Sequence, residues 1–466
     1  MKKLILLRNV MILLCFLTVG SNAWAKVRLP NIIGSHMVLQ QKSKVKLWGW
    51  AAASETITIK TTWDTTTYKA VANNGAHWEA EINTPAAGGS YTITIEGENK
   101  IVLEDVLIGE VWVCSGQSNM EWSGDQDLKE SINEAPHANQ PEIRLFYVSK
   151  STALYPQDNL EGKWVVCSPE SMIHFSAIGY FFGKKINSSI KTPVGLINAN
   201  WGGTPAETWT PAYVIEKDPI IKKGAESLGQ YAWWPSNTAI AYNAMIAPLT
   251  KFSISGVLWY QGESNVSSYY SYEQLFTGMI DAWRAAWNKN FPFYFVQIAP
   301  YTYGNNINGA LLRETQTKAS RHPNTAMVVV SDLVPDTTNI HPTLKIEVAN
   351  RLANIALKNI YNQNMGVVNG PLYESLQVEK EKAILSFSNI GAGLMCKDKE
   401  LNHFEIAGAD HLFVPGTAKI IGDKIIVTNK NIKAPVAVRY AFNNTAIGNV
   451  FNKEGLPLNL FRTDNW

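Results

Sequence analysis

In the middle of the chain, short apolar runs alternate with stretches of helical spacing, and this rhythm limits the possible folds more than any other feature. The runs at residues 106–114, 194–199 and 254–260 are almost uninterrupted, whereas residues 272–287 carry apolar side chains at helical intervals. Strands of a parallel sheet have such continuous runs, because helices cover the sheet on both faces. The pattern therefore predicts an α/β domain over residues 106–365.

Shorter runs that alternate apolar and polar residues flank this segment on both sides. Before it, runs such as Thr56-Ile-Thr-Ile-Lys60 are separated by turn clusters rich in Asn and Gly, which predicts a small antiparallel β-sandwich over residues 26–105. Similar runs return after the central segment and predict a β-rich region over residues 366–466. Whether this last region is a separate domain or packs with the first sandwich is open at this stage.

The first 25 residues have the pattern of a secretory signal peptide. Lys2, Lys3 and Arg8 precede an apolar stretch at residues 10–19, and Ala23-Trp-Ala25 matches the small-x-small pattern of a cleavage site. We expect cleavage after Ala25 and export of the mature chain to the periplasm or the extracellular space. No later stretch approaches the roughly 20 consecutive apolar residues of a membrane span.

Charge and cysteine content exclude several classes of function. The 41 basic and 39 acidic residues give a formal net charge of +2, which leaves no surplus of positive charge for a nucleic acid partner. Cys15 lies in the signal, and Cys114, Cys167 and Cys396 have no C-x-x-C spacing, so one disulfide at most is possible. The histidines are scattered without a helical i, i+4 pair. We expect no metal and no cofactor.

Small, polar or titratable residues follow four of the expected strands. Because the carboxyl ends of parallel strands meet at one rim, where open α/β sheets bind ligands, these residues are expected to share one site. They are Ser115-Gly-Gln-Ser-Asn-Met120, Asn200-Trp-Gly-Gly-Thr204, Gln261-Gly-Glu-Ser-Asn265, and the loop from Asp332 through Asp336 and Asn339 to His341.

This set of residues fits the hydrolysis of an ester, which needs a nucleophile, a base and donors for the developing oxyanion. Ser118 is the expected nucleophile and His341 the expected base. The amides of Ser118 and Gly203 and the side chain of Gln261 are the expected oxyanion donors, and the missing Cβ of Gly203 permits close approach. The Gly-x-Ser-x-Gly elbow of α/β-hydrolases is absent, because Met120 stands where its second glycine belongs.

Four blocks in this order resemble the sialate O-acetylesterase family, which belongs to the SGNH-type hydrolases. The resemblance extends into the flanking regions through Met37-Val-Leu-Gln40 and Phe461-Arg-Thr-Asp464, so it covers nearly the whole mature chain. The four blocks are Gly116-Gln-Ser-Asn-Met120, Trp201-Gly-Gly-Thr-Pro-Ala-Glu-Thr-Trp209, Trp259-Tyr-Gln-Gly-Glu-Ser-Asn265 and Ile340-His-Pro342.

The resemblance implies a flavodoxin-like, three-layer α/β/α catalytic domain with flanking β-sandwich-like regions. It also implies metal-free removal of O-acetyl groups from a carbohydrate substrate, sialic acids first, with Ser118 and His341 as nucleophile and base. Acetylxylan, another acetylated carbohydrate, or a catalytically decayed carbohydrate-binding protein are the alternatives. Trp209, just beyond Gly203, is the expected wall of the substrate pocket, because aromatic faces can stack on sugar rings.

One position departs from the family pattern. Relatives usually have Asp-Ile-His-Pro, whereas Asn339 precedes Ile340 here, and an amide cannot be the anionic partner of a histidine. The triad acid is then Asp336, Asp332 or Glu263, or the triad is incomplete and a neutral acceptor orients the ring. Asp336 is slightly favoured because it lies in the same loop as His341. A glutamate at the position of Glu263 is implicated beside the histidine in the related acetylxylan-esterase branch.

Overall fold

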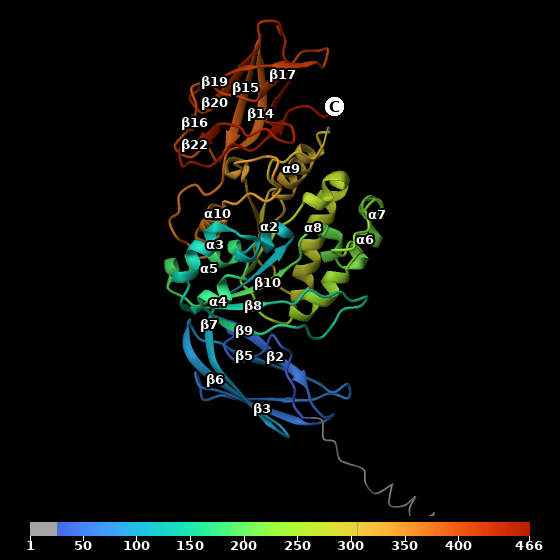
Figure 1. Cartoon of the computed structure of the whole chain (residues 1–466), viewed down its shortest axis with the longest axis vertical. Coiled ribbons are helices and arrows are strands. Elements are labelled where there is room, and N and C mark those ends of the chain that lie inside the picture. Colours follow the sequence, from blue (N-terminus) through green and yellow to red (C-terminus); the bar gives the residue numbers. More distant parts are fainter. Residues whose placement is uncertain (1–25, 305) are drawn as a thin grey trace, which may run out of the picture.

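The computed structural model describes residues 26–304 and 306–466 and places three regions one after another along the long axis (Figure 1). The N-terminal strands lie at one end, a mixed α/β region lies in the middle, and the C-terminal strands lie at the other end. The expected signal peptide falls outside the described residues. Over the described part of the chain, no helix is long and apolar enough to span a membrane.

The N-terminal strands enclose one apolar core. Strands β2 and β5 pair antiparallel, and β3 pairs antiparallel with β4 and β6. Leu47, Ile59, Ile82 and Ile95, from four of these strands, are buried in the same cluster, as the alternating pattern predicts. The bounds are β1 (Val38–Gln40), β2 (Lys44–Trp50), β3 (Thr56–Thr61), β4 (Thr67–Val71), β5 (His77–Asn83) and β6 (Gly88–Glu96).

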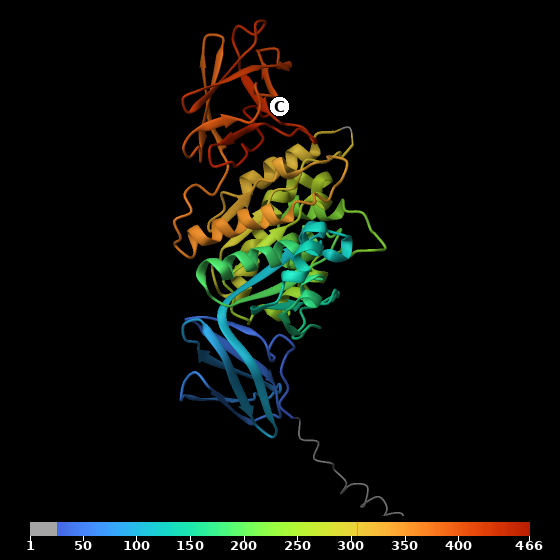
Figure 2. The same cartoon turned by 60° about the vertical axis from the view of Figure 1, so that its left-hand side comes forward.

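One long strand joins the N-terminal region to the central sheet. Strand β7 (Lys100–Gly116) pairs with β6 through its first half and with β10 and β11 through its second half. The boundary expected between residues 105 and 106 therefore falls inside a continuous strand. Figure 2 shows this strand rising from the N-terminal region into the centre.

The central sheet has the strand order β13-β12-β11-β7-β10-β8-β9. Its strands run parallel except β9, which is antiparallel to β8. Every residue of β10 and β11 is buried, as their continuous apolar runs predict. The bounds are β8 (Gln140–Tyr147), β9 (Trp164–Cys167), β10 (Val194–Asn200), β11 (Gly256–Tyr260), β12 (Phe293–Val296) and β13 (Thr325–Val328).

Helices pack against both faces of this sheet. Trp112 and Cys114 of β7 share a core with α5 and α10, whereas Val111 and Val113 share a core with α8, because successive side chains of a strand point to opposite faces. The long helices are α5 (Ala177–Ile190), α8 (Tyr269–Trp287), α9 (Asn308–Ala319) and α10 (Lys345–Asn359), and the short ones are α2 (Ser118–Glu121), α3 (Lys129–Glu134), α4 (Pro169–Met172), α6 (Ala212–Lys217) and α7 (Pro219–Glu226).

The C-terminal strands form a separate core that contacts the central region through α9. Arg462 pairs with Glu314 of α9 at 2.8 Å, and the amide of Gly309 donates to Asn444 Oδ1 at 2.9 Å. This region lies at the end of the molecule opposite the N-terminal strands (Figure 2). Its strands are β14 (Leu372–Glu379), β15 (Lys382–Ser388), β16 (Leu394–Cys396), β17 (Phe404–Ala407), β18 (Phe413–Pro415), β19 (Thr417–Ile421), β20 (Lys424–Thr428), β21 (Ala437–Tyr440), β22 (Val450–Asn452) and β23 (Phe461–Arg462).

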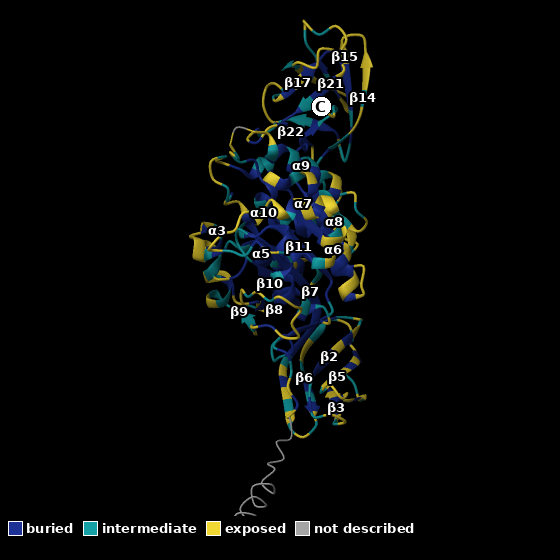
Figure 3. Ribbon diagram, turned by 90° about the vertical axis from the view of Figure 1, so that its right-hand side faces the viewer, coloured by how far each residue is buried: buried dark blue, intermediate teal, exposed yellow. Residues whose placement is uncertain are grey.

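Burial is concentrated in the central sheet, while exposed residues lie on the outer helices and on the two end regions (Figure 3). Cys114, Cys167 and Cys396 are all free thiols. The one disulfide that the sequence allowed is therefore not formed.

Candidate active site

The carboxyl end of β7 lies at the point where the chain changes sides in the sheet. After β7 the chain builds β8 and β10 on one side of it and then β11, β12 and β13 on the other. Open α/β sheets bind ligands in the crevice at such a switch point. The turn that follows β7 leads directly into α2, and Ser118 is the first residue of that helix.

Ser118 is placed by a turn that only glycine can make. Gly116 has φ of +130°, and a Cβ at this position would lie 2.2 Å from the carbonyl oxygen of Tyr260 in β11. The amide of Gln117 donates to that same carbonyl at 2.9 Å. The end of β7 therefore passes against β11, and the chain turns sharply to present Ser118.

Ser118 and His341 come together although 223 residues separate them. The Oγ atom of Ser118 and the Nε2 atom of His341 lie 2.9 Å apart, which is a hydrogen bond. His341 lies in the loop that leads into α10. A nucleophile and a base in this geometry are the first requirement of a serine hydrolase.

The His341 ring is partly buried against an aromatic side chain. Trp122 stacks on it, with 4.5 Å between ring centroids and 26° between planes. Burial lowers the pKa of His341 to about 4, and the nearby positive charge of Lys345 acts in the same direction. At neutral pH the imidazole is therefore uncharged, which is the form that can accept a proton.

The two aspartates of the His341 loop have partners of their own. Asp336 is exposed, and its Oδ1 accepts hydrogen bonds from the hydroxyl of Thr338 at 2.7 Å and from the Thr338 amide at 2.8 Å. These bonds lower the pKa of Asp336 below its ordinary value. Asp332 accepts two hydrogen bonds from Arg351, at 2.7 and 2.8 Å, and ties the loop to α10. This arrangement gives no support to the preference for Asp336 as the triad acid.

Asn339 bonds the backbone of the loop. Its Oδ1 accepts a hydrogen bond from the backbone amide of His341 at 2.9 Å. Within residues 26–304 and 306–466, no carboxylate forms a hydrogen bond or an ion pair with the His341 ring. The contacts are those of a Ser118–His341 dyad.

Glu263 is buried and reaches the His341 loop only through another side chain. Its Oε1 accepts a hydrogen bond from Asn119 Nδ2 at 2.6 Å, and its Oε2 has no partner among the described atoms. Asn119 Nδ2 also donates to the carbonyl oxygen of Ile340 at 3.1 Å. Burial raises the pKa of Glu263, although the bond from Asn119 and the charge of Lys345 oppose this rise.

Two of the three expected oxyanion donors are free to act. In the described part of the chain, the backbone N–H groups of Ser118 and Gly203 donate a hydrogen bond to no acceptor. The neighbouring Gly202 lies against the nucleophile, since a Cβ there would be 3.3 Å from the Cβ of Ser118. Gly203 has φ of +80°, which favours glycine.

The third expected donor, Gln261, has its side chain fully occupied. Its Nε2 donates to the carbonyl of Thr204 at 3.3 Å and to Asn265 Oδ1 at 2.7 Å, and its Oε1 accepts from the hydroxyl of Tyr272 at 2.9 Å. An amide nitrogen has two hydrogens, so none remains for an oxyanion. Gln261 is also completely buried. In this bonding Gln261 braces the loops and is not an oxyanion donor.

The expected pocket wall, Trp209, is part of the core. It has no exposed surface, its Nε1 donates to Thr204 Oγ1 at 2.9 Å, and its ring packs edge-on against Trp259. The aromatic ring beside Gly203 is that of Trp234, because a Cβ on Gly203 would lie 2.2 Å from it.

Trp234 belongs to an aromatic segment that follows α7. Its ring packs against that of Tyr231, with centroids 4.9 Å apart, and both line a small pocket together with Gly203 and Ser264. Trp233 between them is 76% exposed. The aromatic side chains beside Gly203 therefore come from this segment and not from Trp209, and the density of aromatic residues in it is the sequence signal that points to them.

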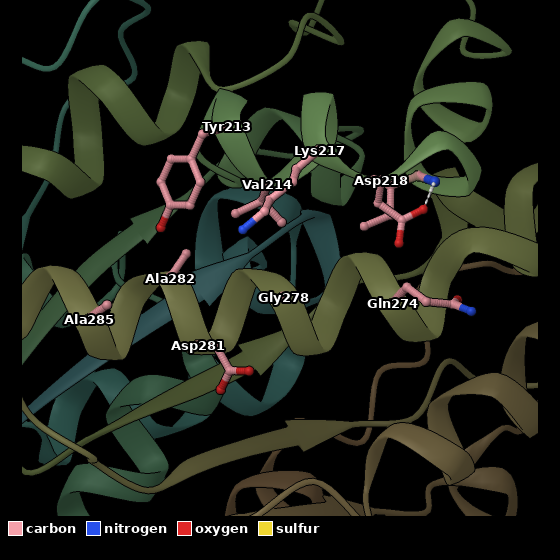
Figure 4. Close-up of a pocket in the computed structure, with 10 residues that line it drawn as sticks. Tyr213, Val214, Lys217, Asp218, Gln274, Gly278, Asp281, Ala282 and Ala285 are labelled. Carbon is pink, nitrogen blue, oxygen red and sulfur yellow. Dashed lines mark hydrogen bonds between the residues drawn. The ribbon is translucent and has the colours of Figure 1, made fainter.

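A larger pocket lies between α6, α7 and α8. It measures about 480 Å³, and Figure 4 shows Tyr213, Gln274 and Asp281 among its labelled lining residues. None of its lining residues belongs to the motif blocks. Throughout the described residues, no group of three or more His, Cys, Asp or Glu side chains is arranged to hold a metal.

Comparison with known proteins places this chain in a family. The family described as "Carbohydrate esterase, sialic acid-specific acetylesterase" matches residues 108–358, more than half of the chain. The chain belongs to this family. It is therefore a carboxylic ester hydrolase, and the resemblance found in the four motif blocks is confirmed.

Individual relatives extend the match beyond the central region. The sialate O-acetylesterase of Homo sapiens is 29% identical over 399 residues, covering 78% of this chain and 76% of the relative. That of Rattus norvegicus is 27% identical over 503 residues, covering 93% of each chain. The crystal structure of a carbohydrate acetylesterase from Xanthomonas citri has a TM-score of 0.87 and 34% identity, covering 95% of this chain and 100% of that one.

Proposed function

We propose that this esterase removes O-acetyl groups from sialic acids, with Ser118 as nucleophile and His341 as general base. The observation that carries the proposal is the 2.9 Å contact between Ser118 Oγ and His341 Nε2 at the switch point of the sheet. The substrate class is supported by relatives that are named sialate O-acetylesterases and match most of the chain.

The reaction follows from the positions of these groups. His341 Nε2 takes the proton of the Ser118 hydroxyl while Oγ attacks the acetyl carbonyl, and the new oxyanion faces the N–H groups of Ser118 and Gly203. The C–O bond to the sugar then breaks, and the sugar oxygen takes the proton from His341. A water molecule, deprotonated by His341, then attacks the acetyl-Ser118 ester. The bond between the acetyl carbon and Oγ breaks, acetate leaves, and Ser118 Oγ regains the proton from His341.

The base operates here without a carboxylate partner. Trp122 holds the ring by stacking, and Asn339 fixes the backbone amide of His341. A carboxylate at the second ring nitrogen would stabilise the imidazolium, and its loss in a serine protease triad costs about 10⁴ in kcat. We expect a slower enzyme than one with a complete triad.

A second candidate substrate is another acetylated carbohydrate, such as acetylated xylan. The Xanthomonas citri relative, which is 34% identical and matches nearly the whole chain, is described more broadly as a carbohydrate acetylesterase. In this reading, the same dyad would act on a different sugar.

The decisive experiment measures acetate released from O-acetylated sialic acid, acetylated xylan and a generic aryl acetate. We expect the sialic acid ester to be the best substrate, and Ser118→Ala to abolish release from all three. Ser188→Ala, an exposed hydroxyl on α5, is the matched control and keeps full activity. Release from xylan alone would favour the second candidate, and release from none would contradict both.

We further infer that the central region is a flavodoxin-like, three-layer SGNH hydrolase domain over residues 106–365, flanked by β domains over 26–105 and 366–466. The two helix layers and the parallel strands support the three-layer fold of the central region, although β7 continues across its first boundary. Export through residues 1–25, with cleavage after Ala25, is part of the same proposal. Mass analysis of the mature N-terminus after secretion tests it, and a chain that retains residues 1–25 would contradict it.

A further inference from the structure

Lys345 is a buried cation beside the dyad. It is the first residue of α10 and is only 1% exposed. Burying an ammonium group is costly unless partners satisfy its charge and its hydrogens. The proposed reaction assigns Lys345 no step, so its position next to the reacting groups needs a reason.

The first contact of Lys345 is with the residue that follows the nucleophile. Its Nζ donates to Asn119 Oδ1 at 2.6 Å. Because an ammonium group can only donate hydrogen bonds, this contact fixes which end of the Asn119 amide faces it. Asn119 Nδ2 must then point the other way, to Glu263 Oε1 and to the Ile340 carbonyl. The Lys345 contact therefore holds the Ser118 turn against the residue that precedes His341.

The second contact runs through Trp122. Lys345 Nζ lies 5.8 Å from the centroid of the Trp122 ring and 5.5 Å from that of Tyr260. Cations within about 6 Å of an aromatic centroid are attracted to the ring. The same Trp122 ring stacks on His341. Lys345 thus contacts Asn119 inside α2 and Trp122 directly after this helix, and each of the two contacts the His341 loop.

The charged groups around Lys345 come from several elements. Glu130 Oε2, from α3, accepts hydrogen bonds from the backbone amides of Lys345 at 2.6 Å and of Ile346 at 2.9 Å. Glu263 lies on the short helix η6 (Glu263–Ser268). Burial lowers the pKa of Lys345 to about 7, although both carboxylates oppose this. Below that pH Lys345 is charged, and its charge makes the nearby His341 harder to protonate.

We propose that Lys345 is a positioning residue: through Asn119 and Trp122 it holds the Ser118 turn and the His341 loop together. This inference rests on the proposed function. A triad carboxylate usually orients the histidine, and here a buried lysine has that task. The two differ in their electrostatic effect, because a carboxylate raises the pKa of the imidazole and a cation lowers it.

The test is Lys345→Met in the full chain, assayed with the aryl acetate over a range of pH. We expect kcat to fall roughly tenfold to a hundredfold with little change in KM, because the reacting groups lose their alignment. We also expect the acidic limb of the kcat profile to move to higher pH, because His341 loses a neighbouring positive charge. Lys345→Arg, which keeps the charge, should hold the limb near its original position.

Lys358→Met, an exposed lysine at the other end of α10, is the matched control and changes neither quantity. If Lys345→Met keeps both kcat and the acidic limb, the inference is wrong. If Lys345→Met does not fold, Asn119→Asp decides: it can still accept from Lys345 but cannot donate to Ile340, so unchanged kcat would overturn the inference. Full activity in Ser118→Ala would instead overturn the proposed function, so the two failures are distinguishable.

Discussion

The two loops that meet at the dyad are built in different ways. The nucleophile turn, residues 116–122, is packed against β11 and contains Asn119, which joins Lys345, Glu263 and Ile340. The His341 loop, residues 331–344, carries the exposed Asp336 and is shaped by local turns at Thr338 and Asn339. From this contrast we infer that the buried turn supplies the rigidity and that the exposed loop depends on it to place His341.

The largest effect is expected from the centre of the nucleophile turn. Ser118→Ala removes the attacking oxygen and little packing, so kcat should fall roughly 10³- to 10⁶-fold while the fold is retained. Acetate release and a circular dichroism spectrum measure the two properties. Near-normal turnover in a folded variant would show that another residue is the nucleophile.

The rigidity of the turn itself is tested at Gly116. A methyl group there would collide with the Tyr260 carbonyl at a φ of +130°, so Gly116→Ala should lower the free energy of unfolding by about 2–4 kcal/mol. Gly366→Ala is the matched control, because its φ is +63° but nothing lies within 4 Å of the added Cβ. We expect about 1 kcal/mol there. Equal losses in denaturant unfolding would contradict the close packing of the turn.

The contact between the two loops is tested at Trp122. Trp122→Leu removes the ring that stacks on His341 and exposes the imidazole, so kcat should fall roughly tenfold to a hundredfold. The pKa of His341, now about 4, should rise toward its ordinary value as its burial is reduced. Because the neutral ring is the active form, the acidic limb of kcat/KM should move to higher pH. Trp63→Leu, in the N-terminal region, should leave the limb in place.

The smallest effect is expected in the exposed loop. Asp336→Asn should change kcat by less than about twofold, because the described hydrogen bonds of this carboxylate go to Thr338. Loss of a true triad acid would lower kcat by about 10⁴. Asn339→Asp should also leave activity near its original level, since either side chain can accept from the His341 amide. A hundredfold loss in Asp336→Asn would restore this residue as the triad acid and refute the dyad.

The sequence predicted the parts of the fold that have strong periodicity. The expected helix at residues 272–287 is α8, and the buried run at residues 194–199 is β10. The sequence pattern does not predict strand β8, because β8 begins Gln-Pro-Glu and carries Arg144 in its centre, which hides the apolar run. It does not predict β9 either, which has only four residues. Helix α9 was missed as well, since its sequence is largely polar and its buried face includes Arg313 and Gln316.

The sequence also predicted that Ser118 and His341 share one site, and their side chains lie 2.9 Å apart, but it did not predict their surroundings. Ser118 and His341 were expected at strand ends, where parallel topology alone brings residues together. The roles of Gln261 and Trp209 depend on which atoms their side chains bond and how deeply they are buried, and motif position carries no information on either. Lys345 was overlooked because a lysine at the start of a helix usually faces solvent.

The proposed reaction passes through an acetyl group bound to Ser118, and this acyl intermediate can be trapped. The enzyme is mixed with O-acetylated sialic acid, quenched in acid within the first turnovers, digested and mapped by mass spectrometry. We expect one acetyl group on the peptide that contains Ser118 and none in Ser118→Ala. An acetyl group on a different residue, together with undiminished acetate release by Ser118→Ala, would contradict the proposed reaction.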